Sequence, residues 1–201
     1  MSFNKNKYQV IKKAIPKDLA KFIFDYFVLK RDAVKYMYEN NIVRQTAVLG
    51  NWKDTQISNA YCHYADFVME TLLIKVMPIM KKETNLNLIP TYSYARIYEK
   101  GCILHKHKDR TSCEVSTTLN LGGDMWPIYL EGVKIELTPG DMLVYSGCEL
   151  EHWREEFKGN ICAQVFLHYN YVDGKFKDNN LYDKRPLLGL PSFVKKTDNK
   201  Q

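Results

Sequence analysis

The chain has 201 residues, of which 45% are hydrophobic and 26% are charged, a balance typical of one globular domain with a single sizeable core. No apolar run approaches the roughly 20 residues that a membrane-spanning helix needs, and residues 1–7 lack the apolar core of a signal peptide. We therefore expect neither a membrane association nor a secretion signal.

The 29 Lys and Arg residues exceed the 23 Asp and Glu residues and give a formal net charge of +6. A basic surface can favour nucleic acid, but no helix-turn-helix, zinc-finger or RNA-binding signature accompanies this one, so a nucleic-acid partner is not expected. The five cysteines are scattered, odd in number and free of Cys-x-x-Cys pairs. This pattern indicates reduced thiols and a cytoplasmic protein.

The first part of the chain has the spacing of helices. Residues 8–15 favour a strand, and a helix is predicted to begin after Pro16 because apolar side chains then recur at helical spacing. A second helix is predicted over residues 64–82, with Pro78 placed where it would kink or stop that helix. The polar residues 43–59 between the helices are interpreted as a surface connection rather than a loop at the mouth of a site.

From residue 91 onward the pattern changes to short strands bounded by Gly, Pro and Asp. The predicted strands are residues 92–98, 116–121, 127–130, 133–137, 142–145 and 161–169. Helices followed by strands predict an α+β fold, a double-stranded β-helix (a jelly-roll, cupin-like barrel) buttressed by N-terminal helices.

The whole chain, residues 1–201, is predicted to be one domain. Residues 1–90 would be mostly helical support, residues 91–172 the barrel core with the site, and residues 173–201 a C-terminal tail whose segment 185–191 packs back onto the domain. The turn at 139–141 predicts that strand 142–145 lies antiparallel to its predecessor, 133–137.

One tripeptide in the barrel region indicates a metal site. Side chains alternate along a strand, so His107 and Asp109 of His107-Lys108-Asp109 would share one face. A His-x-Asp sequence is common by chance, but His152 on a later strand would complete a set of two histidines and one carboxylate. That set suits non-haem Fe(II), because it leaves coordination positions open for a chelating cosubstrate and dioxygen.

With these residues the chain resembles a known family, the 2-oxoglutarate- and Fe(II)-dependent dioxygenases. Within that family it resembles the prolyl 4-hydroxylase-like group. The resemblance spans most of the chain and rests on residues 95–101, 104–109, 139–141, His152 and 164–169. It implies that His107, Asp109 and His152 are the iron ligands and that no other catalytic side chain is needed. It also implies Fe(II) as cofactor with 2-oxoglutarate and O2 as cosubstrates, and it brings ascorbate into consideration.

The chain departs from this family at one place. Family members usually hold the distal carboxylate of 2-oxoglutarate with an Arg or Lys on the strand after the second histidine. Here residues 160–169 contain neither, and Asn160 stands where the basic residue is expected. A buried dicarboxylate needs a cationic or multiply hydrogen-bonded partner, so the partner must lie elsewhere.

Three residues are predicted to bind the cosubstrate. Tyr98 matches the tyrosine that family members often place on the strand leading to the first histidine, and Thr118 could add a hydroxyl. Lys158 is the first choice for the cation, although it could equally be a solvated turn residue. The other candidates for the cation are Arg154, Arg96 and Arg110.

The predicted function is hydroxylation of a C–H bond, with a prolyl residue of a peptide or protein as the substrate closest to the resemblance, and with release of succinate and CO2. A small-molecule substrate is the alternative, because one fold serves many substrates. A rival interpretation is a cupin-type metal protein that uses His105, His107 and His152 without 2-oxoglutarate. A barrel used only for binding is a third. Oligomeric state cannot be predicted.

Overall fold

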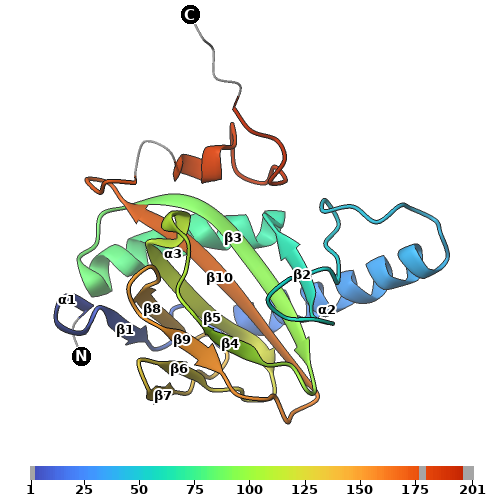
Figure 1. Cartoon of the computed structure of the whole chain (residues 1–201), viewed down its shortest axis with the longest axis horizontal. Coiled ribbons are helices and arrows are strands. Elements are labelled where there is room, and N and C mark those ends of the chain that lie inside the picture. The colour runs from blue at the N-terminus through green and yellow to red at the C-terminus, as the bar shows by residue number, and fades with distance from the viewer. Residues whose placement is uncertain (1–2, 177–179, 197–201) are drawn as a thin grey trace, which may run out of the picture.

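The computed structural model describes residues 3–176 and 180–196, which form two antiparallel β-sheets that pack face to face (Figure 1). The larger sheet has the strand order β1 (Tyr8–Ile11), β8 (Met142–Ser146), β5 (Val115–Gly123), β10 (Ile161–Tyr171), β3 (Leu88–Glu99) and β2 (Tyr61–Tyr64). The smaller sheet has the order β4 (Leu104–His107), β9 (His152–Arg154), β6 (Ile128–Leu130) and β7 (Val133–Ile135). This architecture is a double-stranded β-helix with supporting helices, and it confirms the predicted fold class.

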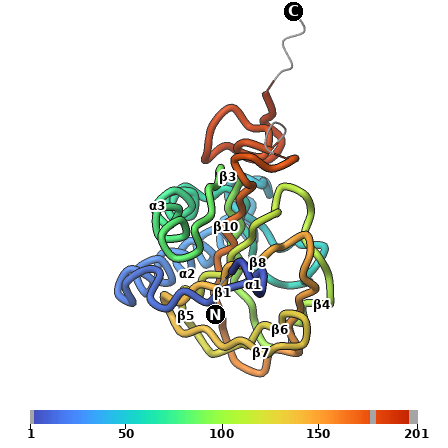
Figure 2. Tube along the Cα trace, turned by 90° about the vertical axis from the view of Figure 1, so that its left-hand side faces the viewer, coloured from blue at the N-terminus to red at the C-terminus, as the bar shows by residue number. Residues whose placement is uncertain are grey.

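Two long helices cover the outer face of the larger sheet. They are α2 (Lys17–Glu39) and α3 (Phe67–Thr84); a short α1 (Phe3–Asn6) and two 3-10 helices, η1 (Thr111–Cys113) and η2 (Leu181–Lys184), complete the described helices. Figure 2 shows α2 and α3 side by side on one side of the sheet, away from the smaller sheet. Asp66 caps α3, because its side chain accepts hydrogen bonds from the backbone N–H groups of Val68 and Met69.

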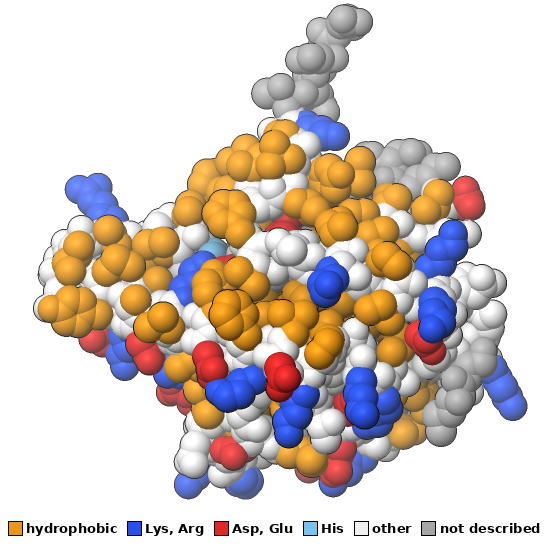
Figure 3. Space-filling view, turned by 180° about the vertical axis from the view of Figure 1, so that it is seen from behind, with side chains coloured by type: hydrophobic (Ala, Val, Ile, Leu, Met, Phe, Trp, Pro, Cys, Tyr) orange, Lys and Arg blue, Asp and Glu red, His pale blue; other side chains and the backbone are white. Residues whose placement is uncertain are grey.

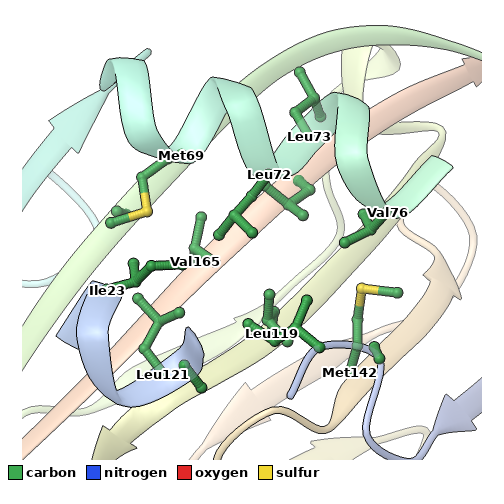
Figure 4. Close-up of a cluster of buried hydrophobic side chains, with 14 of the residues drawn as sticks. Ile23, Met69, Leu72, Leu73, Val76, Leu119, Leu121, Met142 and Val165 are labelled. Carbon is green, nitrogen blue, oxygen red and sulfur yellow. The ribbon is translucent and has the colours of Figure 1, made fainter. Parts of the chain in front are cut away.

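The larger sheet is buried on both faces, and the alternation of side chains along its strands divides them into two sets. Apolar side chains of β5, β8 and β10 point towards the helices, where Leu119, Met142 and Val165 meet Leu72 and Val76 of α3 (Figure 4). The alternate side chains of the same strands point into the barrel, and many of these are polar. Buried polar residues among them are Ser116, Thr118, Gln164 and His168, and Arg96 of β3 is also buried.

Three predicted details are wrong. Helix α3 continues six residues past Pro78, which lies on the exposed side of the helix, where the carbonyl left without a partner can be hydrated. Residues 61–64 form strand β2, which the sequence analysis missed. Strand β8 pairs with β1 and β5 rather than with the preceding strand, because β7 belongs to the other sheet.

The C-terminal segment packs back onto the domain, as predicted. The buried guanidinium of Arg185 donates to Glu70 Oε2 (3.0 Å) and to the Thr91 carbonyl (3.1 Å), and the Gly189 N–H donates to the same Glu70 oxygen (2.9 Å). Residues 177–179 and 197–201 of the predicted tail lie outside the described residues.

The surface over the helices retains many apolar side chains (Figure 3). Those of Phe22 and Leu29 on α2, and of Phe67 and Ile74 on α3, are exposed. Even so, none of the described helices is both long and apolar enough to cross a bilayer.

Asp141 connects the residues that follow β1 to the barrel. Its buried carboxylate accepts hydrogen bonds from the Lys13 N–H (3.0 Å), the Lys12 ammonium (2.8 Å), and the Thr138 N–H (3.0 Å) and hydroxyl (2.7 Å). Burial alone would raise the pKa of Asp141, but these donors lower it to about 2. The ionised form is therefore the one that stabilises the fold.

We predict that Asp141→Asn lowers the free energy of unfolding by about 1–3 kcal/mol at neutral pH, because an amide replaces a charged acceptor. The contribution of Asp141 is present above the unfolded-state pKa, near 3.9, and is lost as pH falls towards about 2. Urea unfolding at pH 7 and pH 3 measures both effects. The exposed Asp173→Asn is the control, and equal stability of Asp141→Asn and wild type at pH 7 would contradict the prediction.

Candidate metal centre

His107, Asp109 and His152 meet at one end of the barrel. His107 ends β4 and lies directly opposite His152, the first residue of β9, with the ring centroids 4.2 Å apart. Asp109 Oδ1 lies 3.8 Å from His107 Nε2 and 3.6 Å from His152 Nε2. One ligand atom from each residue falls within 4.8 Å of the others. This spacing can accommodate a single metal ion.

Backbone carbonyls fix the orientation of both imidazoles. His107 Nδ1 lies 2.8 Å from the His105 carbonyl, and His152 Nδ1 lies 3.1 Å from the Leu150 carbonyl. If each Nδ1 carries the proton and donates it, each Nε2 is left as a free acceptor that faces Asp109. Neutral imidazoles held in this way each have a free ring nitrogen in position to bind a metal ion.

Asp109 follows β4 instead of lying on it, so strand alternation does not explain its position. Its N–H donates to the Gly147 carbonyl (2.8 Å), and its Oδ2 accepts a hydrogen bond from the Ser116 hydroxyl (2.6 Å). Burial would raise the pKa of Asp109, but His152, His168 and Ser116 lower it to about 2. The carboxylate is ionised, and Oδ1 is the oxygen left for a metal.

Gly147 leaves room for this carboxylate. A Cβ atom at position 147 would lie 2.5 Å from Asp109 Oδ2, 2.6 Å from Ser116 Oγ and 2.4 Å from the Cys113 carbonyl oxygen. Such distances are too short for a side chain, so glycine is required here by space. Any larger residue would displace the carboxylate or the strands around it.

His105 does not join the site, which corrects the cupin-type ligand set of His105, His107 and His152. The register of β4 against β9 shifts between Leu104 and His107, so an irregularity in the strand breaks the simple alternation. The His105 side chain is exposed, and only its carbonyl contributes, through His107. Among the described residues, the group whose geometry could hold a metal ion is His107, Asp109 and His152.

The three side chains open onto a cavity of about 480 Å³ between the two sheets. Leu104, Ile128 and Phe166 form apolar parts of its wall, and Thr118 and Tyr145 contribute hydroxyls. The Tyr145 hydroxyl lies 3.4 Å from His152 Nε2. The wall of the cavity therefore combines apolar side chains with many charged and hydroxyl groups.

The three residues predicted to bind the cosubstrate differ in their position relative to the cavity. Thr118 lines the cavity, and Tyr98 is fully buried on the interior face of β3; both hydroxyls lack a hydrogen-bond partner. Lys158 is exposed in the connection between β9 and β10, pairs with Glu156 and does not line the cavity. The cation expected in the barrel therefore has to come from another residue.

The mouth of the cavity includes part of the 43–59 segment, so its interpretation as a plain surface connection is wrong. Asp54 Oδ2 accepts hydrogen bonds from Arg96 Nε (2.6 Å) and from the Tyr94 hydroxyl (2.9 Å). Gln56 Oε1 accepts from Arg96 Nη2 (2.6 Å). These bonds fold the loop over β3 and neutralise the Arg96 charge.

The C-terminal segment contacts residues that line the mouth of the cavity. Asp183 pairs with both terminal nitrogens of Arg110, each at 3.1 Å, and accepts a hydrogen bond from the Tyr64 hydroxyl (2.7 Å). The Arg110 guanidinium also lies over the Tyr92 ring, 4.6 Å from its centroid. Asp183 has φ of 54°, an uncommon value for a residue with a side chain.

Sequence reasoning missed four residues that shape the centre: Ser116, Gly147, His168 and Asp183. Ser116 Oγ lies between Asp109 and His168 Nδ1 (3.0 Å), and burial lowers the pKa of His168 to about 4, so this imidazole is neutral. Strand parity could have found Ser116 and His168, because both lie on the interior face. Gly147 and Asp183 depend on contacts between distant segments, which leave no local signal.

The comparisons with known proteins support the fold. No family model and no curated protein matches the sequence. Among solved structures, a Pseudomonas putida prolyl-4-hydroxylase is 16% identical, with a TM-score of 0.61 over 84% of this chain and 95% of that one. HygX from Streptomyces hygroscopicus, with nickel, 2-oxoglutarate and hygromycin B bound, is 12% identical, with a TM-score of 0.59 over 85% of each chain. EctD from S. alaskensis with bound Fe is 13% identical, with a TM-score of 0.57 over 85% and 75%. The chain shares the fold of these oxygenases.

We predict that Ser116→Ala weakens divalent-metal binding roughly tenfold, because removal of a partner that orients a ligand typically costs at least that much. Calorimetric titration with Mn(II) measures the effect. Ser58→Ala, at an exposed position, is the control. An unchanged Mn(II) affinity in Ser116→Ala would show that the serine does not orient Asp109.

Gly147→Ala is predicted to lower Mn(II) affinity more than Ser116→Ala does, because the new methyl group would occupy the space of Asp109 Oδ2 and of a backbone carbonyl. Overpacking of this kind typically costs about 1–3 kcal/mol in stability as well. Circular dichroism melting and Mn(II) titration of the same sample separate the two losses. Wild-type affinity in this variant would contradict the spatial argument.

Proposed function

We propose that this protein is an oxygenase that uses Fe(II), 2-oxoglutarate and O2 to hydroxylate a C–H bond. The observation that carries the proposal is the meeting of His107, Asp109 and His152 at one end of a double-stranded β-helix. The resemblance in sequence and the shared fold with 2-oxoglutarate- and metal-bound proteins support it.

The donor set fits the proposed metal. Two neutral imidazoles and one carboxylate are the ligands typical of non-haem Fe(II) sites in oxygenases. They leave one positive charge of a divalent ion uncompensated, which suits an anionic chelating cosubstrate. The carbonyls behind His107 and His152, and the hydroxyl behind Asp109, keep all three ligands in place before a metal binds.

In this proposal the side chains bind and orient the metal and the cosubstrate, and they exclude water. When bound, the iron would supply the chemistry by which O2 oxidises both 2-oxoglutarate and the substrate, so that one oxygen atom enters succinate, the other enters the hydroxylated product, and CO2 is released. Leu104, Ile128 and Phe166 limit the water that can reach the centre from the barrel side. No further acid or base among the side chains is needed, so the metal ligands are the catalytic set in this proposal.

As substrate we propose a prolyl residue of a peptide or protein. The mouth of the cavity offers the stacked rings of Tyr64 and Tyr92, with centroids 4.9 Å apart, beside an Arg110 whose charge Asp183 neutralises. The faces of these two rings pack against each other and against Arg110 and Arg185, so a pyrrolidine ring would pack against the ring edges. The similarity of the fold to a prolyl-4-hydroxylase supports the same choice.

The chemistry is tested by anaerobic titration of Fe(II)-loaded protein with 2-oxoglutarate. A visible charge-transfer band is expected in the wild type and is expected to be lost in His107→Ala, which removes one ligand. His105→Ala is the matched control and should keep the band. Fe(II) binding without a band in the wild type would rule out the proposed cosubstrate.

The substrate is tested separately, in air, with ascorbate present to keep the iron reduced. Proline-containing peptides are expected to stimulate succinate release and to gain one oxygen atom in mass, whereas the same peptides with alanine in place of proline should do neither. Stimulation by small molecules but by no peptide would replace the prolyl substrate and leave the cofactor assignment standing.

A further inference from the structure

Arg154 is a buried cation without an anionic partner. It lies on β9, two residues after His152, and is 1% exposed. Its Nη1 donates to the Trp126 carbonyl, and the guanidinium lies over the Trp126 ring, 5.0 Å from the centroid. Its Nε and Nη2 have no hydrogen-bond partner among the described residues. A buried charge in this state is unfavourable unless a ligand completes it.

The other candidate cations are already satisfied. Arg96 pairs with Asp54, Arg110 pairs with Asp183, and Lys158 pairs with Glu156 at the surface. Each of these three has a carboxylate partner, whereas no ion pair holds Arg154 within the described part of the chain. The free positive charge in the barrel is therefore that of Arg154.

Two unpartnered hydroxyls belong to the same interior. Tyr98 on β3 and Thr118 on β5 are both buried, and neither hydroxyl has a hydrogen-bond partner among the described residues. Burial raises the pKa of Tyr98, and the nearby positive charges of Arg96 and Arg154 oppose this rise. Native interiors rarely leave several polar groups unsatisfied together, so this cluster points to a missing polar ligand.

The cluster adjoins the metal side of the cavity. Arg154 pairs across the sheet with Leu104 of β4, and the register of β6 against β9 brings Ile128 to its other side. Both neighbours line the cavity, as do Thr118 and His152. Because His152 and Arg154 are two residues apart on one strand, their side chains point to the same face.

We propose that Arg154, with the hydroxyls of Tyr98 and Thr118, holds the distal carboxylate of 2-oxoglutarate. This inference rests on the proposed function, and it moves the cationic partner to β9 from the start of the following strand, where Asn160 stands just before β10. A guanidinium with two free donor groups can bind a carboxylate through paired hydrogen bonds, and the two hydroxyls can complete its coordination. The ligand would be a dicarboxylate whose 2-oxo acid group faces the metal.

The test compares two ligands that differ only at the far end, 2-oxoglutarate and 2-oxopentanoate, by anaerobic calorimetry on Mn(II)-loaded protein. Wild type is expected to bind 2-oxoglutarate roughly a hundredfold more tightly, the size typical of a buried charged pair. Arg154→Met should remove this preference and leave 2-oxopentanoate binding unchanged. Lys158→Met is the matched control and should behave as wild type.

A second variant, Arg154→Lys, keeps the test informative should Arg154→Met fold poorly. It retains the positive charge but loses the paired donor groups, so it should keep only part of the preference for 2-oxoglutarate over 2-oxopentanoate. Equal binding of the two acids by wild type, or an unchanged preference in a folded Arg154 variant, would overturn the inference alone. Failure of wild type to bind either acid would overturn the proposed function and this inference with it.

Discussion

The burial of the larger sheet on both faces is the constraint on which the rest of the molecule depends. One face must be apolar to pack against α2 and α3, and strand alternation then sends every second side chain into the barrel. Polar side chains on that inner face cannot reach bulk water, so each needs a partner inside the protein or a ligand. The side chains that face the helices therefore support the fold, and those that face the barrel form the site.

The inner polar groups fall into two classes. Around the metal centre they satisfy each other: Ser116 joins Asp109 to His168, and carbonyls hold His107 and His152. Deeper in the barrel, Nε and Nη2 of Arg154 and the hydroxyls of Tyr98 and Thr118 lack hydrogen-bond partners among the described residues. The first class holds side chains that could bind a metal ion. The second leaves polar groups that could bind an anion. Thr118 lines the same cavity as the metal centre, and Arg154 lies beside it through its neighbours Leu104 and Ile128.

Much of this was predictable because it depends on short-range patterns. The fold class followed from strand periodicity and turn residues, and the metal triad followed from ligand types in their order along the chain. The irregularity in β4 was not predictable, because it depends on pairing with β9, and it is what turns His105 away. Lys158 and Arg154 could not be ranked from sequence, since only burial and missing partners separate them. The contribution of Asp183 to the mouth depends on the return of the C-terminal segment, which joins residues far apart in sequence.

A crystal structure grown anaerobically with Mn(II) and 2-oxoglutarate tests the central claim most directly, namely that the inner face holds one metal and one dicarboxylate side by side. The account predicts Mn(II) bound by His107, Asp109 and His152, with the distal carboxylate on Arg154. A metal bound elsewhere, or a distal carboxylate on Arg96 or in solvent, would contradict it.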